Sequence, residues 1–77
     1  MSLIVRGLPV LVEAEEQGEP VAYWWQGQRR VIEDVVCLWD DRCYCTAHWL
    51  VQSTDGHRAT LIFDRAASQW MLEPIDL

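Results

Sequence analysis

Lysine is absent from the sequence. All six basic residues are arginine, against twelve aspartates and glutamates, which gives a net charge of −6 and a pI of about 4.6. Non-specific binding to DNA or RNA draws most of its affinity from the neutralisation of phosphates, so this charge balance disfavours it. A narrow site that stacks a few unpaired bases on aromatic side chains stays compatible with the composition.

Long apolar runs are absent as well. No stretch approaches the ~20 residues of a membrane-spanning helix, so we expect no membrane partner. The apolar stretch near the N-terminus is too short for a signal peptide, and it lacks a basic leader and a small-residue cleavage site. Three cysteines, an odd number in a chain without an export signal, predict reduced thiols and a cytoplasmic location.

No long segment keeps the period of an amphipathic helix. Short apolar runs joined by turns instead predict an all-β domain, a small antiparallel meander of five to six strands that curls into a barrel or half-barrel. At 77 residues we expect one domain spanning 1–77, in which residues 1–7 are a candidate flexible N-terminal segment. The expected strands cover residues 8–14, 21–26, 29–39, 43–52, 57–64 and 69–72, with Ile75 as the furthest end of the last.

The centre of the predicted domain is the stretch from residue 20 to residue 49, which holds four of the five tryptophans and all three cysteines. Gln26-Gly27 separates an aromatic run from a β-branched run, which is a hairpin signal. The run that follows, 29–39, does not alternate cleanly, because Glu33 and Asp34 interrupt it. This interruption predicts a bulge or a sharp bend there, with a short helical turn as the alternative.

Large aromatic side chains are most simply interpreted as core material in a domain this small. Alternation places Ala47, Trp49 and Val51 on the inner face of strand 43–52, together with Cys43 and Cys45. His48 then points to the opposite face. The predicted core consists of Val31, Val35, Trp39, Trp49, Leu61, Phe63, Trp70 and Leu72.

The residues that could carry chemistry are few. Cys37, Cys43, Cys45 and His48 are ligands that zinc accepts, but the spacing contains no Cys-x-x-Cys knuckle and His48 faces away from the thiols. The same face argument disfavours a Cys–His catalytic pair. We therefore expect the thiols to pack in the core or at its boundary. The sequence predicts no enzymatic activity, no catalytic residue, no metal and no cofactor.

A binding surface is the remaining interpretation of the aromatic residues. Trp24 and Trp25 cannot share a face, so one of them is free to form an interaction hot spot with Arg29 or Arg30. The alternative is that this tryptophan is covered by the acidic loop or by the N-terminal segment. A second functional hypothesis is single-stranded nucleic-acid binding. Both hypotheses draw on the same candidate binding residues, namely Trp24, Tyr44, Arg29 and Arg30.

A frame of tryptophan, glycine and arginine residues runs through most of the chain: Pro20, Trp25, Gly27, Arg29, Val31, Trp39, the aromatic strand 44–49, Gly56, Leu61, Trp70-x-Leu72 and Asp76. With this frame the chain resembles the small bacterial domains of unknown function numbered DUF6504, found alone or at the C-terminal end of ImuB-type, Y-family polymerase-like proteins. The resemblance implies a non-catalytic β-domain that docks onto proteins of translesion DNA synthesis. The cysteine cluster and the strong acidity depart from that pattern and argue against direct contact with DNA.

The sequence thus predicts a non-catalytic protein–protein interaction module, accessory to DNA repair. Its expected partner is another protein, or a second copy of the chain in a homodimer.

Overall fold

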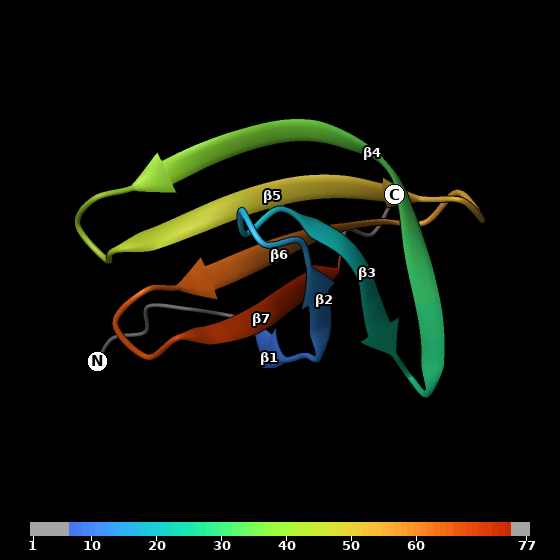
Figure 1. Cartoon of the computed structure of the whole chain (residues 1–77), viewed down its shortest axis with the longest axis horizontal. Coiled ribbons are helices and arrows are strands. Elements are labelled where there is room, and N and C mark those ends of the chain that lie inside the picture. The colour runs from blue at the N-terminus through green and yellow to red at the C-terminus, as the bar shows by residue number, and fades with distance from the viewer. Residues whose placement is uncertain (1–6, 75–77) are drawn as a thin grey trace.

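The computed structural model describes residues 7–74, which form one antiparallel sheet without helices (Figure 1). The sheet has seven strands in the order β1-β7-β6-β5-β4-β3-β2. Their bounds are β1 (Leu8–Pro9), β2 (Val12–Ala14), β3 (Pro20–Trp25), β4 (Gln28–Asp41), β5 (Thr46–Ser53), β6 (Arg58–Asp64) and β7 (Gln69–Pro74). The predicted all-β antiparallel meander is confirmed.

The sheet curls because the consecutive strands β1 and β2 pair at its two opposite ends. β1 pairs with β7, and β2, which follows at once, pairs with β3 on the far side of the sheet. The connection continues this pairing, since the Val10 N–H donates to the Trp70 carbonyl at 3.2 Å and the Trp24 N–H donates to the Leu11 carbonyl at 3.0 Å. The predicted single strand 8–14 is therefore two short strands with different partners, which raises the count to seven.

The predicted hairpin between β3 and β4 is confirmed, with Gln26 and Gly27 as its two turn residues. Both have positive φ, 53° at Gln26 and 80° at Gly27. This pair of angles is typical of a type I′ turn, whose twist matches that of the flanking strands.

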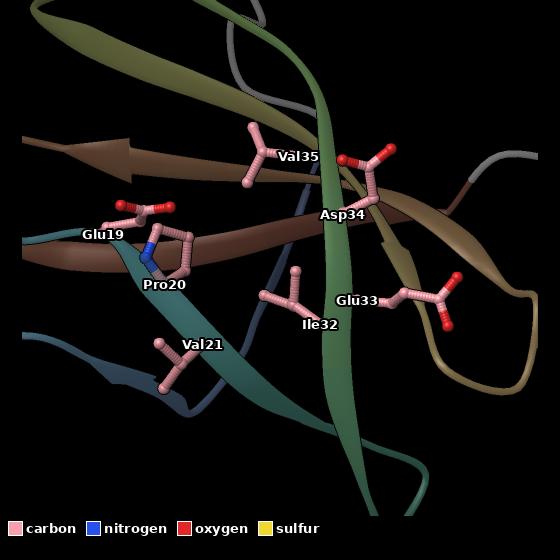
Figure 2. Close-up of a pocket in the computed structure, with 7 residues that line it drawn as sticks. All are labelled: Glu19, Pro20, Val21, Ile32, Glu33, Asp34 and Val35. Atoms are coloured by element: carbon pink, nitrogen blue, oxygen red, sulfur yellow. The ribbon is translucent and has the colours of Figure 1, made fainter.

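β4 bends sharply between its two halves (Figure 1). Its register against β5 shifts between Ile32 and Asp34, which confirms the predicted bulge and replaces the alternative of a helical turn. The extra residue changes the phase of the strand, so that Ile32 and Val35 point toward β3 while Glu33 and Asp34 point to the other side (Figure 2). Val35 therefore faces inward together with Ile32 and not, as predicted, with Val31.

Two members of the predicted core are wrong for this reason. Val31 is exposed, opposite Ala22 on the outer face of the sheet. Trp39 is exposed because a second register shift, between Val35 and Cys37, changes the phase again. After it, Leu38 lies on the concave face opposite Trp49, where it stays 52% exposed because β3 does not pair with this part of β4, and Trp39 lies on the convex face.

The core lies on the concave side of the sheet. Its buried cluster consists of Tyr23, Val51, Ala59, Leu61 and Leu72. Of the other predicted members, Val35, Trp49 and Trp70 are partly buried and pack against this cluster. Phe63 is partly buried and lies 5.0 Å from the Trp70 ring, centroid to centroid.

The predicted placement of the cysteines is wrong. β5 begins at Thr46, so Cys43 and Cys45 lie in the preceding turn, and all three thiols are exposed. Cys45 has a φ of 54°, a turn conformation that a strand residue does not adopt. The alternation of residues 43–52 holds only from Thr46 onward.

Two further predictions, on a flexible segment at residues 1–7 and on Ile75 as a strand end, fall wholly or mostly outside the described residues. Within residues 7–74, no helix of the length and apolarity needed to cross a membrane is present.

Candidate protein-interaction surface

The outer side of β4 is the most unusual feature of the sheet. β3 pairs only with Gln28–Val31 of this strand, whereas β5 pairs with it from Ile32 to Asp41. Among the described residues, no strand pairs with the other side of Ile32–Asp41, and Figure 1 shows this half of β4 arching along the rim of the sheet. We call residues 32–41 the free edge.

The middle of the free edge is apolar and exposed. Val36, Leu38 and Trp39 retain 42%, 52% and 43% of their accessible surface. Cys37 between them is exposed too. An apolar edge strand carries unpaired backbone donors and acceptors beside hydrophobic side chains, which together form a template for another strand.

The two faces of the free edge differ in composition. On the concave face, Ile32 and Val35 precede Leu38, which lies opposite Trp49. On the convex face the register places four residues in a row, Asp34, Cys37, Trp39 and Asp41, opposite Gln52, Leu50, His48 and Thr46. The convex row therefore has an apolar middle between two carboxylates.

Trp39 is held in a fixed orientation. Its ring stacks on His48 with centroids 5.1 Å apart and an interplanar angle of 11°. The His48 Nε2 lies 2.9 Å from the Thr46 Oγ1, and Thr46 is buried. A large aromatic side chain that is exposed yet ordered by its neighbours is typical of an interaction hot spot.

A wedge-shaped hollow lies at the first end of the free edge, where β3 and β4 separate (Figure 2). Its volume is about 360 Å³, and Pro20 and Val21 of β3 face Ile32 and Val35 of β4 across it. Glu19 lies at the start of the β3 side. A strand added to the free edge would enter next to this wedge.

The sequence-predicted site residues Trp24 and Arg29 lie together near the β3–β4 turn. The Arg29 Cζ is 5.8 Å from the centre of the Trp24 ring, and both residues share the outer face of the hairpin. Arg29 is also bound by Glu13, through hydrogen bonds of 2.9 Å from Nε and 2.8 Å from Nη2. This hydrogen-bonded pair lowers the pKa of Glu13 and raises the pKa of Arg29, so the guanidinium already has a carboxylate partner while both side chains stay exposed.

Arg30 faces inward, on the same face as Tyr23 and away from Arg29. Its side chain is 11% exposed and its Nη1 lies 2.5 Å from the Asp55 Oδ2. Asp55 also accepts hydrogen bonds from the Ser53 hydroxyl and the His57 N–H, and the bond from Ser53, above all, lowers its pKa. Arg30 is thus part of a structural cluster at the end of the core, where burial raises the pKa of Tyr23.

Tyr44 lies far from the other three predicted site residues. It is 56% exposed in the β4–β5 turn, at the opposite end of the 14-residue β4 from the β3–β4 turn. The structure therefore does not bring Trp24, Arg29, Arg30 and Tyr44 into one site.

The thiols are similarly separated by element. Cys37 lies on β4, whereas Cys43 and Cys45 lie in the turn, and His48 contacts Thr46 and Trp39. Within the described part of the chain, no group of three or more His, Cys, Asp and Glu side chains is arranged to hold a metal ion.

An aromatic hollow opens on the concave face at the other end of the sheet. Trp49, Phe63 and Trp70 line it, and the β2–β3 loop contributes Gly18. Arg65 lies at its edge. It donates to Asp40 of the free edge at 2.8 Å, across the small side chain of Ala47.

The free edge is not among the features predicted from the sequence, although the sequence contains one signal for it. The predicted strand 29–39 is much longer than its hairpin partner 21–26, so its second half could not have been covered by that partner. The exposed residues Leu38 and Trp39 lie in this uncovered half.

Comparisons of the chain with protein-family models, with curated proteins and with solved structures gave no match. The resemblance to the domains numbered DUF6504 therefore stays a prediction.

Proposed function

We propose that this chain is a non-catalytic protein–protein interaction module that docks a partner through the free edge of β4. The observation that carries the proposal is the coincidence of an unpaired strand edge with exposed apolar side chains at Val36, Leu38 and Trp39. An edge of this kind gains both hydrogen bonds and apolar burial when a strand of another polypeptide is added to it. Left uncovered, it would favour aggregation.

The position of the arginines makes nucleic-acid binding the weaker candidate. Arg29 and Arg30 are each engaged by a carboxylate, and Tyr44 lies at the far end of β4. A single-stranded site would have to break these ion pairs before it could neutralise a phosphate.

The cellular setting is part of the proposal. The resemblance noted above supports a role accessory to DNA repair, in which the module docks onto other proteins. The three exposed free thiols support a cytoplasmic, reducing environment.

Selection of peptides from a random display library tests the proposal. We expect the immobilised wild-type chain to retain a set of peptides that is lost when Val36→Ser and Leu38→Ser are combined. The matched control combines Leu8→Ser and Leu11→Ser, which removes two leucines that are more exposed and lie away from the free edge, and it should retain the set. Urea unfolding of both variants checks that each still folds.

The same proteins are then titrated with a short single-stranded oligonucleotide over a salt series. Binding that falls steeply with salt, together with equal peptide retention by both double variants, would overturn the proposal in favour of a nucleic-acid site.

A further inference from the structure

The free edge carries negative charges that oppose pairing with a second copy of the same edge. On the convex face, Asp34 and Asp41 stand at the two ends, with Cys37 and Trp39 between them. Among the described residues, neither aspartate takes part in an ion pair, nor does the adjacent Glu33. The edge therefore has an unpaired carboxylate at each end and an apolar middle, and at its second end Arg42 of the following turn stands next to Asp41.

A second copy of the chain is a poor occupant of this edge. In an antiparallel pair, each copy meets the convex row of the other in reverse order, so Asp34 of each copy lies near Asp41 of the other. A parallel pair through the same edge requires one copy to be turned over, so the convex row of one copy would meet the concave row of the other. Like charges that face each other across two strands are destabilising, and the chain as a whole carries a net charge of −6.

The position of the carboxylates shows that the free edge is not built only to avoid aggregation. An edge that only needs to avoid aggregation is best served by charges in its middle, where they would interrupt a pairing strand. The middle of the free edge instead carries the exposed apolar side chains of Leu38 and Trp39. The arrangement repels a copy of itself and leaves the apolar middle open to a partner of opposite charge.

We propose that the free edge binds an extended peptide segment of another protein, apolar in its middle and basic at both ends. The segment adds as a strand to Ile32–Asp41, and its basic side chains lie near Glu33 and Asp34 at one end and Asp41 at the other. Ten residues of edge accommodate a segment of about eight to ten residues. This inference rests on the proposed function and specifies the chemistry of the partner.

Asp40 is the exception among these carboxylates. It faces the concave side, opposite Ala47, and Arg65 already neutralises it at 2.8 Å. The concave side of the bound segment therefore meets Ile32, Val35 and Leu38 and has no free charge to match. The segment that fits best carries its basic residues toward the convex side.

Calorimetric titration with synthetic peptides of about ten residues tests the inference. The first peptide has alternating threonine and valine in its middle and two arginines at each end. In the second, glutamines replace the arginines, and in the third, glutamates replace them. We expect the arginine peptide to bind roughly tenfold more tightly than the glutamine peptide, and the glutamate peptide not to bind.

Two variants locate the effect. Glu33→Gln combined with Asp34→Asn should weaken the arginine peptide roughly fivefold, as expected for two partly exposed charge pairs. Glu15→Gln combined with Glu16→Gln changes the net charge equally in the β2–β3 loop and should leave the affinity unchanged. Raising the salt from about 50 mM to about 300 mM should weaken the arginine peptide far more than the glutamine peptide.

The possible failures can be told apart. Equal binding of all three peptides would overturn the charge rule while leaving the docking edge intact. Binding of none of them, together with a salt-resistant dimer in solution, would overturn the inference in favour of a second copy. Binding of none by a monomer would overturn this inference, whereas the proposed function falls only if the Val36→Ser/Leu38→Ser variant retains the same library peptides as its control.

Discussion

At the scale of the residue, the structure separates exposed side chains from side chains that hold the fold together. Arg30 is a predicted binding residue, but it forms an ion pair of 2.5 Å with Asp55 that joins the ends of two hairpins. The Ser53 hydroxyl donates to Asp55 as well, and Ser53 is itself buried. This cluster therefore contributes to stability and leaves no free cation for a ligand.

The cluster predicts a dependence of stability on pH. The pKa of Asp55 is lowered in the folded chain, chiefly by the Ser53 hydroxyl. A carboxyl group with a lowered pKa contributes stability that is present above its unfolded value, near 3.8, and is lost as the pH falls through its folded value. Asp55→Asn should therefore flatten the fall in stability below about pH 4.

Urea unfolding midpoints measured from neutral pH down to acid check this prediction. Glu15→Gln, in the exposed β2–β3 loop, is the control and should follow the wild-type curve. Identical curves for wild type and Asp55→Asn would contradict the assigned role of this carboxylate.

The inward or outward direction of a side chain could be predicted from the sequence where the strand is regular. The predicted inward positions Leu61 and Leu72 follow from a period of two and are buried, whereas Tyr23 is buried without being among the predicted core residues. Cys43 and Cys45 fit the same pattern but lie in a turn. The period of two assumes a strand, and nothing in the side chains showed that the strand begins only at Thr46.

At the scale of the element, the shape of the sheet depends on the two bulges of β4. The first is visible in the sequence, because Glu33 and Asp34 place two carboxylates in an otherwise apolar run. The second, between Val35 and Cys37, falls among apolar residues and leaves no polar mark. This hidden bulge turns Trp39 outward, which is why a predicted core residue belongs to the candidate site.

The β3–β4 turn gives a prediction for a single element. Gly27 has a φ of 80° and open space around the position of a Cβ, so Gly27→Ala meets strain in the backbone and no clash. We expect a loss of about 1 kcal/mol in the free energy of unfolding. Gln26→Asn should instead stabilise the chain slightly, because asparagine accepts the positive φ of 53° more readily than glutamine.

Denaturant unfolding of the two variants is the measurement. Gly18, with a φ of 96° in the solvated β2–β3 loop, provides the comparison variant Gly18→Ala. A loss for Gly18→Ala as large as that for Gly27→Ala fits the account, since both positions are strained. No loss for Gly27→Ala would contradict the type I′ turn.

At the scale of the whole molecule, the described strands leave the outer side of β4 unpaired from Ile32 to Asp41. At the other boundary of the sheet, β1 pairs with β7 and β2 pairs with β3. The fold class could be predicted from the turns and short runs of the sequence. The sequence signals the free edge only through the unequal lengths of the predicted strands 21–26 and 29–39, because it does not show whether another strand covers the second half of the longer one.

The most direct test of docking at the free edge is hydrogen exchange of the backbone amides of the full chain, with and without the arginine-ended peptide. We expect added protection within residues 32–41, at the amides that do not face β5, and no change in β2 or β7. Protection around Trp24 and Arg29 instead, or no protection anywhere at saturating peptide, would contradict the account.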